Sequence, residues 1–478
     1  MEFNMKNIVL TSELAGKRVA LIGAGVSNMP LIGFLRAAGA EVTLREKKTA
    51  EELGARAEEI VSLGARLICG EDYLADLTED IIVRSPGIRP DIPEFAEATE
   101  RTSRLACEME LFAANAPCPV YAVTGSDGKS TTTTILSKLL TCKGKVYLGG
   151  NIGEPLYQKT LDMTADDTAA VELSSFQLMT MDAPFASVII TNVTPNHLNW
   201  HTGMDEYIEA KKNILRRAGG AVLNFDNDVT RKIGEELISE GKTPVTWFSL
   251  DEMKQNHGAV RVFFLDHQGD VRVREACGCE QILMNRRDVL LPGKHNVANY
   301  MAAAGAAWDV TTPEIIREVA STFGGVRHRL QFIAEKNGVR YYNSSIDSSP
   351  TRTAAAISAL SESAPERKIV IICGGYDKNI PFEPLAEAIL TCANIKSVVL
   401  TGATRDKIMA AMESSPLYAD SKLTIHIEAD FTDAVKASAR LAEEGETVLL
   451  SPACASFDAF PNFEARGEKF ASVVREEL

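Results

Sequence analysis

The stretch Val120-Tyr-Ala-Val-Thr-Gly-Ser-Asp-Gly-Lys-Ser-Thr131 contains an apolar run, a glycine-rich turn and the expected start of a helix. A loop that binds phosphate needs glycines for close backbone approach, a lysine for the terminal phosphates and a hydroxyl for Mg²⁺. The usual eight-residue pattern has a glycine where this chain has Val123, so an ordinary glycine-containing turn is the alternative. The strand before the turn and the helix after it favour nucleotide binding. The residues expected at the nucleotide are Gly125, Ser126, Asp127, Gly128, Lys129, Ser130 and Thr131.

On both sides of this stretch, short apolar runs alternate with amphipathic segments, which is typical of parallel α/β domains. The pattern breaks at Pro117 and Pro119, and again near Gly324 and Gly325. Between about 245 and 291 the runs alternate in polarity, which predicts an antiparallel extension on a parallel core. We therefore expect an α/β fold with three domains. These are a Rossmann-like domain over 1–116, a phosphate-loop domain over 117–325 and a second Rossmann-like domain over 326–478. The expected strands cover 18–22, 41–45, 80–84, 120–124, 169–173, 187–193, 221–224, 260–264, 271–274, 368–373, 397–401 and 447–451.

Composition restricts the class of partner. The 478 residues exceed what one hydrophobic core usually fills, and 50 Lys and Arg against 65 Asp and Glu give a formal charge of −15. This acidic balance argues against duplex nucleic acid or an anionic membrane as the main partner. The nine cysteines include no CxxC pair, which argues against a disulfide framework or a zinc ribbon, and the neighbouring Cys277 and Cys279 lack a second pair. We expect a reduced, cytoplasmic monomer. We also expect no membrane insertion, because no apolar run approaches the roughly 20 residues of a membrane span.

Three further positions carry candidate chemistry. Glu172 ends an expected strand and could share Mg²⁺ with Ser130, although an exposed strand-end carboxylate is the alternative. His197 and His201 follow another strand, but the neighbouring Asn and Pro residues place them in a turn, so His197 either binds metal or orients a substrate. Lys211 lies in a helical stretch, where a solvated helix face is the ordinary interpretation.

The N-terminal segment Gly23-Ala-Gly25-Val-Ser-Asn28 is an incomplete dinucleotide fingerprint, because Asn28 replaces the third glycine. Glu46 lies near the place where an acid that binds ribose is expected. Binding of a diphosphate at this helix N-terminus is physically reasonable, since free amides and the helix dipole favour an anion. Binding of NAD is the weaker alternative.

Together these segments resemble the Mur ligases, the ATP-dependent amide-forming enzymes of peptidoglycan precursor synthesis. The resemblance covers nearly the whole chain. It implies an enzyme that adds D-glutamate to UDP-N-acetylmuramoyl-L-alanine through an acyl phosphate made with ATP. The segments that carry it are Thr124–Thr131, Gly149–Gly153, Glu172–Gln177, Asn192–His201, Pro292–Asn296 with Asn299, His328–Arg329, Gly374–Lys378, Ser451–Asp458 and Asn462–Gly467.

The resemblance also implies roles for individual residues. Lys129, Glu172, His197 and Lys211 would be catalytic. Two Mg²⁺ ions are implied, one held by Ser130 and Glu172 and the other by His197 and a carbamoylated Lys211. The further residues implied for ATP are Asn296, Asn299 and Arg329. Those implied for the UDP-sugar are Gly25, Val26, Ser27, Glu46, Ser85, Gly87, Asn151, Ser174 and Gln177. Those implied for D-glutamate are His197, Ser348, Lys378, Ser456, Phe457 and Phe463.

The chain departs from the usual family pattern in four places. Ser126-Asp127 replaces Thr-Asn, and Asn199-Trp200 replaces Asp-Arg, which puts local ion pairing in doubt. Ser344 replaces an aspartate, and Ile346 replaces a lysine that helps to fix the incoming glutamate. Isoleucine cannot bind a carboxylate, so we expect Lys378 or Arg352 to take over part of that role.

Three other functions stay open. One is an amide ligase of the same superfamily with a different Mur precursor or a folate-type substrate. Another is a catalytically silent protein that binds a UDP-sugar, which Ile346 and Ser344 suggest and the retained metal ligands oppose. The third is an NAD-linked oxidoreductase, which would require cofactor binding by the first domain.

Overall fold

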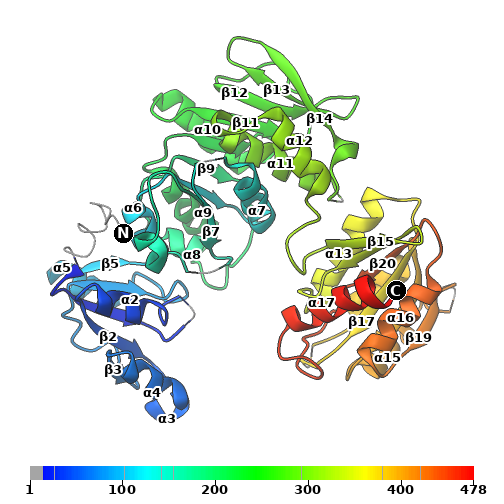
Figure 1. The fold of residues 1–478 in the computed structure, drawn as a ribbon, viewed down its shortest axis with the longest axis horizontal. Coiled ribbons are helices and arrows are strands. Elements are labelled where there is room, and N and C mark those ends of the chain that lie inside the picture. Colours follow the sequence, from blue (N-terminus) through cyan, green and yellow to red (C-terminus); the bar gives the residue numbers. More distant parts are fainter. Residues whose placement is uncertain are drawn as a thin grey trace. The chain divides into compact units, whose positions relative to one another are not determined.

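Three sheets organise the chain in the computed structural model (Figure 1), which describes residues 14–25, 27–101, 103–141, 143–153, 155–291, 293–378, 380–419 and 421–478. The chain clusters into two compact units, Met1–Arg286 with Ala298–Val319 and Arg287–Val297 with Ala320–Leu478. Each sheet is wholly or mainly parallel, so the predicted α/β class is confirmed. The three domain ranges, 1–116, 117–325 and 326–478, stay a prediction.

The first sheet is parallel, with the strand order β3-β2-β1-β4-β5. Alternate residues of β1 face opposite layers: Val19 and Leu21 pack in the core with α2, whereas Ala20 and Ile22 pack with Phe95 of α5. This period of two is what a strand buried on both faces requires. The elements are β1 (Arg18–Ile22), α2 (Leu31–Ala37), β2 (Glu41–Glu46), α3 (Ala50–Leu53), α4 (Ala55–Ser62), β3 (Arg66–Cys69), β4 (Ile81–Arg84), α5 (Pro93–Arg101), β5 (Arg104–Ala106) and α6 (Glu108–Asn115).

The second sheet has the strand order β14-β13-β12-β11-β10-β9-β6-β8-β7. It is parallel from β7 to β12, and only the β12–β13 and β13–β14 pairs are antiparallel. The predicted antiparallel extension is therefore confirmed, but it begins after Leu265 rather than near 245. The strands are β6 (Val120–Thr124), β7 (Val146–Gly150), β8 (Thr168–Glu172), β9 (Ser187–Ile190), β10 (Ala221–Asn224), β11 (Val245–Ser249), β12 (Arg261–Leu265), β13 (Asp270–Glu275) and β14 (Glu280–Asn285). The helices are α7 (Lys129–Leu139), α8 (Ser175–Leu178), α9 (Met204–Lys212), α10 (Asp228–Glu240), α11 (Lys294–Ala307) and α12 (Pro313–Thr322).

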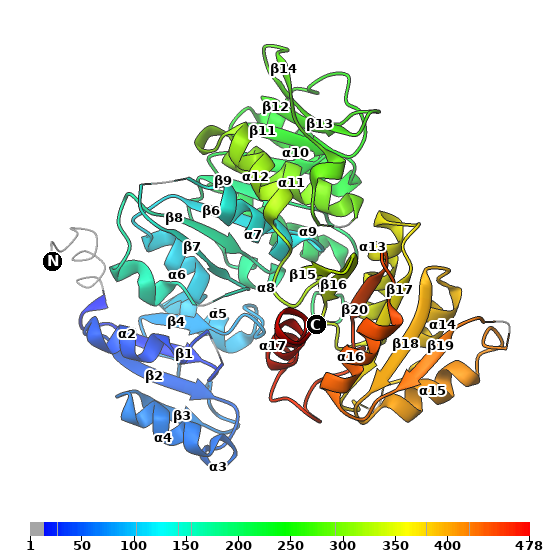
Figure 2. The same cartoon turned by 45° about the vertical axis from the view of Figure 1, so that its right-hand side comes forward.

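The third sheet, in the second unit, has the order β15-β16-β20-β17-β18-β19, and only β15 is antiparallel to its neighbour. Side chains of β17 alternate between two cores, with Ile371 on the side of α13, α14 and α15 and Ile372 on the side of α16 and α17. Helices therefore cover both faces of this sheet (Figure 2). The elements are β15 (Gln331–Lys336), β16 (Val339–Asn343), α13 (Pro350–Ser363), β17 (Ile369–Gly374), α14 (Glu383–Thr391), β18 (Ile395–Thr401), α15 (Arg405–Glu413), β19 (Thr424–Ile427), α16 (Phe431–Leu441), β20 (Thr447–Leu450) and α17 (Phe463–Ser472).

Every strand expected from the sequence is present, with ends that differ by three residues at most. The strands that the pattern missed include all six edges of the three sheets, namely β3, β5, β7, β14, β15 and β19. Edge strands are only partly buried, so they lack the continuous apolar run by which central strands are recognised. In the described part of the chain, no helix is long and apolar enough to cross a membrane.

Two helical glycines give a matched test of the packing. A Cβ at Gly234 of α10 would lie 2.0 Å from the Trp247 ring, whereas a Cβ at Gly33 of α2 would meet nothing within 4 Å. We expect Gly234→Ala to lower the free energy of unfolding by about 1–3 kcal/mol, because the added methyl overfills a packed site. Gly33→Ala should raise it by about 0.5–1 kcal/mol through helix propensity alone. Urea denaturation measures both changes, and equal effects would contradict the described packing.

Candidate active site

The phosphate loop joins β6 to α7, and both of its glycines stand where a side chain would collide. Gly125 has a φ of 149°, and a Cβ there would lie 1.9 Å from Thr191 Oγ1. Gly128 is the N-terminal cap of α7, with a φ of 79°, and a Cβ there would lie 2.5 Å from Asn299 Oδ1. The loop therefore requires glycine at these two positions, as the sequence predicted for close backbone approach.

The segment that follows β9 holds this loop in place. The Ser126 amide donates to the Asn192 carbonyl at 2.9 Å, and the Asp127 amide donates to Asn192 Oδ1 at 3.0 Å. Thr191 Oγ1 donates to the Asp127 carbonyl at 2.6 Å. Strands β6 and β9 are neighbours in the sheet, so the ends of both strands build one rigid loop.

Lys129 lies over the loop that precedes it. Its Nζ donates to the Gly125 carbonyl at 3.0 Å and to the Ser126 carbonyl at 2.8 Å. The ammonium group therefore stands beside the loop backbone at the N-terminus of α7, where a phosphate would be bound. Ser130 follows Lys129 in α7 and is buried.

Glu172 ends β8, which lies beside β6, and its side chain is 1% exposed. Asn151 Nδ2 donates to Oε1 at 2.9 Å, whereas Oε2 is buried without a hydrogen-bond partner among the described residues. The alternative of an exposed strand-end carboxylate is therefore wrong. A buried anionic oxygen without a partner is costly unless a cation neutralises it, so this oxygen fits a Mg²⁺ ligand.

Lys211 of α9 is also 1% exposed, which excludes the solvated helix face. Its Nζ donates to the Gly125 carbonyl at 2.7 Å and to Thr124 Oγ1 at 3.3 Å, and it lies 4.6 Å from the centre of the Tyr207 ring. Burial and the nearby Lys129 lower the pKa of Lys211 well below its ordinary value. Burial therefore disfavours the ammonium form at this position, beside the phosphate loop.

His197 lies in a turn, as predicted, and adopts a left-handed backbone with a φ of 55°. Desolvation and the charges of Lys129 and Lys211 lower the pKa of His197, which favours a neutral ring able to bind a metal. His201 differs, because Glu206 Oε2 lies 3.0 Å from its Nδ1 and Ser175 Oγ lies 2.9 Å from its Nε2. Both of its nitrogens are therefore occupied, and the pair does not form a two-histidine metal face. Among the residues described, no three His, Cys, Asp or Glu side chains gather into a metal site.

The N-terminal glycine loop uses its polar side chains internally. Asn28 Nδ2 donates to the Ile22 carbonyl at 2.9 Å and to the Gly23 carbonyl at 3.1 Å, which explains why a side chain stands in the third glycine position. Glu46 Oε2 accepts the Ala24 amide at 2.8 Å. Ser85 approaches the same loop, with Oγ 3.3 Å from Asn28 Nδ2. Glu46 and Ser85 are thus brought to the loop that contains Gly25 and Ser27, whereas Val26 lies outside the described residues.

Two of the residues predicted to bind the UDP-sugar bind one another. Ser174 caps α8, and the Gln177 amide donates to Ser174 Oγ at 3.3 Å. Gln177 Oε1 in turn accepts the Ser174 amide at 2.8 Å, which completes a capping box. This spacing of Ser and Gln was readable in the sequence. Binding of a sugar nucleotide by these side chains stays a prediction.

The further residues predicted for ATP are divided between the two units. Asn299 belongs to the first unit, where its Oδ1 accepts Thr132 Oγ1 at 3.1 Å. Asn296 lies one helical turn before Asn299 in α11 but clusters with the second unit, as does Arg329. The role of both in nucleotide binding stays a prediction.

In the second unit, two cations lie beside the segment that contains Ile346. Arg352 Nη1 donates to the Ile346 carbonyl at 3.3 Å, and Lys378 Nζ donates to the Ser348 carbonyl at 3.1 Å. Both side chains are exposed. The structure thus brings Lys378 to Ser348 and Arg352 to Ile346. The role of either cation in binding glutamate stays a prediction.

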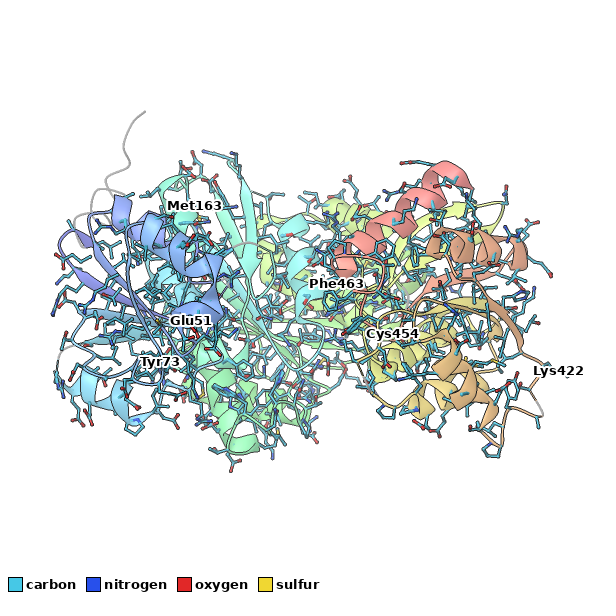
Figure 3. All side chains as sticks on the ribbon, turned by 90° about the horizontal axis from the view of Figure 1, so that it is seen from below. Glu51, Tyr73, Met163, Lys422, Cys454 and Phe463 are labelled. Carbon is cyan, nitrogen blue, oxygen red and sulfur yellow. The ribbon has the colours of Figure 1, made fainter. Side chains whose placement is uncertain are left out.

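Three further residues predicted for D-glutamate, Ser456, Phe457 and Phe463, lie around the same sheet end, whereas His197 belongs to the first unit. Phe457 is 65% exposed and packs edge-on against Tyr376, with ring centres 5.8 Å apart. The Phe463 carbonyl accepts Ser345 Oγ at 2.8 Å, and Ser456 is buried. Phe463 begins α17, and Cys454 follows β20; both are labelled in Figure 3.

Several residues with a role at the site were not singled out in the sequence. Tyr207 lies one helical turn before Lys211 and its Oη is 3.0 Å from Ser126 Oγ, so the i, i+4 spacing was the available signal. Arg466 is 2% exposed and binds only oxygen atoms of Ser345, Cys454 and Ala455 in the described part of the chain. Ion pairing near Asn199-Trp200, which the sequence put in doubt, is present, because Arg89 pairs with Glu206 at 2.7 Å.

Comparison with known families agrees with this geometry. Residues 123–307 match the Mur ligase middle domain, and residues 328–454 match the Mur ligase glutamate ligase domain. UDP-N-acetylmuramoylalanine–D-glutamate ligase of Clostridium novyi is 42% identical over 469 residues, covering 96% of this chain and 97% of the relative. The ligase of the same name from Clostridium perfringens is 42% identical over 466 residues, with the same coverage.

Solved structures agree on the fold. A UDP-N-acetylmuramoyl-L-alanyl-D-glutamate–2,6-diaminopimelate ligase is similar with a TM-score of 0.57 and 16% identity, covering 98% of this chain and 94% of that one. A pseudomurein peptide ligase type C from Methanothermus fervidus has a TM-score of 0.52 and 16% identity, covering 97% of this chain and 100% of that one.

The unpartnered oxygen of Glu172 gives a test that does not depend on turnover. We expect Glu172→Gln to weaken the binding of ADP with Mg²⁺ about tenfold, or about 1.4 kcal/mol, because an amide is a poorer ligand than a carboxylate. Binding of ADP with a chelator present should stay within about twofold. Titration calorimetry measures both affinities. Glu209→Gln, an exposed position of α9, is the control, and equal losses with and without Mg²⁺ would contradict the metal role.

Proposed function

Because this chain belongs to the Mur ligase family, whose members are ATP-dependent amide-forming ligases, we propose that it joins D-glutamate to UDP-N-acetylmuramoyl-L-alanine. The reaction would serve the synthesis of peptidoglycan precursors. One observation carries the chemistry: the phosphate loop, a buried carboxylate with an unpartnered oxygen and a buried lysine meet at adjacent strand ends of one sheet. The choice of substrates rests on relatives that share 42% identity over nearly their whole length.

The proposed reaction begins with phosphoryl transfer. A carboxylate and an amine do not condense in water without activation, so an oxygen of the L-alanine carboxylate attacks the γ-phosphorus of ATP and ADP leaves. Lys129 and the amides of the loop would stabilise the charge that spreads over the transferring phosphoryl group. The close contacts of Gly125 and Gly128 fix these donors in advance, which is what electrostatic stabilisation requires.

The acyl phosphate then reacts with the second substrate. The amine of D-glutamate attacks the acyl carbon, an amide bond forms, and inorganic phosphate leaves with one oxygen of the original carboxylate. We assign D-glutamate to the second unit, where Ser348, Lys378, Ser456, Phe457 and Phe463 lie around the carboxyl ends of the central strands. We assign the UDP group to the glycine loop at Gly25 and Ser27, with Glu46 and Ser85 beside it.

The residues present fit two Mg²⁺ ions, which would neutralise phosphate charge when bound. Glu172 offers a buried unpartnered oxygen, and Ser130 offers its hydroxyl at the start of α7. His197 would supply a nitrogen to the second ion, and Lys211 would supply a carbamate oxygen after reaction of its neutral amine with carbon dioxide. The burial of Lys211 supports this assignment, because it disfavours the ammonium form, which cannot bind a cation.

The product decides the substrate assignment. With ATP, UDP-N-acetylmuramoyl-L-alanine and D-glutamate, we expect a product whose mass is the sum of the UDP-sugar and D-glutamate less one water. ADP should form in equal amount, and L-glutamate or a different Mur precursor should give none. If the L-alanine carboxylate of the UDP-sugar is labelled with oxygen-18, one labelled oxygen should appear in the released phosphate. Phosphate without the label would contradict the acyl phosphate.

Lys129→Ala should lower kcat roughly a thousandfold, because charge stabilisation worth several kcal/mol is lost in the transition state. Lys138→Ala, an exposed position in the last turn of the same helix, is the control and should behave like the parent. Initial rates of ADP release measure both variants. Turnover of Lys129→Ala within about tenfold of the parent would overturn the assigned role.

Lys211→Ala should also be severely impaired, and a small carboxylate such as acetate should restore part of the activity by occupying the vacated space. Lys212→Ala is the neighbouring control, because Lys212 forms ion pairs with Glu209 and Glu236 at the surface. After equilibration with bicarbonate labelled with carbon-13, the parent should show a carbamate resonance that Lys211→Ala lacks. Full activity of Lys211→Ala would refute the carbamate.

The acceptor pocket gives a further test. Replacing both Arg352 and Lys378 with alanine should raise KM for D-glutamate by roughly tenfold to a hundredfold, because charge-assisted hydrogen bonds are worth about 1.5–3 kcal/mol. KM for ATP should change little. Lys396→Ala, which removes a surface ion pair with Glu443 and Glu446, is the control. If the parent ignored D-glutamate and accepted a neutral amino acid, the substrate assignment would fall and Ile346 would be the explanation.

A further inference from the structure

A hydrogen-bonded group in the first unit connects the loop after β4 to the turn that carries His197. We call it the Trp200 bridge, and it consists of Gly87, Arg89, Trp200, His201 and Glu206. Trp200 Nε1 donates to the Gly87 carbonyl at 2.9 Å. Gly87 lies in the segment that we assign to the UDP-sugar, so the indole connects that segment directly to the metal-binding turn.

Arg89 strengthens the same connection. Its Nη1 donates to the Trp200 carbonyl at 2.7 Å, and its guanidinium lies 5.1 Å from the centre of the Trp200 ring. Its Nη2 donates to Glu206 Oε1 at 2.7 Å. The Arg89 guanidinium thus forms an ion pair with Glu206, stacks near the Trp200 ring and donates to the Trp200 carbonyl. A lysine lacks the planar group with several donors that this combination requires.

Glu206 carries the connection into α9, the helix that also contains Lys211. Its Oε2 accepts the Thr202 amide at 3.0 Å and lies 3.0 Å from Nδ1 of the buried His201. The other ring nitrogen of His201 is 2.9 Å from Ser175 Oγ of α8. The bridge therefore contacts both α8, through Ser175, and α9, through Glu206.

His197 depends on the same turn. Its left-handed backbone is unfavourable for a residue with a side chain, and its carbonyl accepts the amides of Trp200 and His201 at 3.0 Å each. The Phe176 ring packs against two rings of this turn, with its centre 5.0 Å from the His197 ring and 4.3 Å from the Trp200 ring. The position of the His197 ring is therefore fixed by residues that the bridge anchors.

We propose that the Trp200 bridge is a positioning device that sets the bound UDP-sugar at a fixed distance from His197. It thereby aligns the L-alanine carboxylate of the UDP-sugar with the γ-phosphate of ATP. This inference rests on the proposed function. Phosphoryl transfer requires the reacting atoms to be about 3–3.5 Å apart and in line, and a misplacement of about 1 Å can lower the rate a hundredfold. A direct indole contact between the two loops is a short and rigid way to meet that requirement.

A pair of tryptophans provides the matched test. Trp200→Phe keeps an aromatic ring but removes the bond to Gly87. Trp308→Phe removes an equivalent bond, from Trp308 Nε1 to Glu275 Oε1 at 2.8 Å, beside the hairpin extension. We expect Trp200→Phe to raise KM for UDP-N-acetylmuramoyl-L-alanine about fivefold to tenfold and to lower kcat by a similar factor. KM for ATP should stay within about twofold, and Trp308→Phe should leave all three constants unchanged.

Melting temperature and a binding signal separate the outcomes. Equal constants for the two variants would overturn the proposal, and so would a rise in the KM of every substrate or a lower melting temperature with unchanged kinetics. In the Trp308→Phe background, only Trp200 and Trp247 remain, and Trp247 is wholly buried. A change of tryptophan emission on adding UDP-N-acetylmuramoyl-L-alanine alone would therefore report on Trp200, and we expect such a change. An unchanged emission with binding proved by calorimetry would also overturn the bridge. If the parent binds this nucleotide but forms no product with D-glutamate, the proposed function fails while the emission test of the bridge still stands.

Discussion

At Gly125 the backbone of the phosphate loop lies so close to Thr191 that no side chain fits, and this contact sets the arrangement of the first unit. It locks the ends of β6 and β9 together through the bonds of Asn192 with Ser126 and Asp127. The chain that leaves this contact carries His197 a few residues later. The phosphate loop and the turn that carries His197 are therefore parts of one rigid structure rather than independent segments.

Lys211 shows what that rigidity is used for. An ammonium group in a site of low dielectric is unfavourable, yet the side chain is held by the Gly125 carbonyl and covered by Tyr207. The carbamate that we propose would replace this buried cation with an anionic metal ligand. The same helix is anchored at its other end through Glu206, so the Trp200 bridge and the buried lysine position one another along α9.

In the second unit, two cations lie near the position of a missing charge. Ile346 removes the expected lysine, but Arg352 and Lys378 both donate to carbonyls of the same short segment. The cations reach it from α13 and from the loop after β17. Their exposure leaves both groups free to turn towards a carboxylate.

The sequence by itself determined the α/β class, the central strands and the phosphate loop, because each depends on neighbouring residues: apolar runs buried on both faces, and glycines followed by a lysine and a hydroxyl. It did not reveal the edge strands, whose partial burial removes that signal. Only the tertiary structure decided that Glu172 and Lys211 are buried. It also decided that both ring nitrogens of His201 have hydrogen-bond partners and that Trp200 donates to the Gly87 carbonyl. The physical reason is that burial and hydrogen-bond partners come from strands and loops that are adjacent in the sheet but separated by tens of residues in the chain.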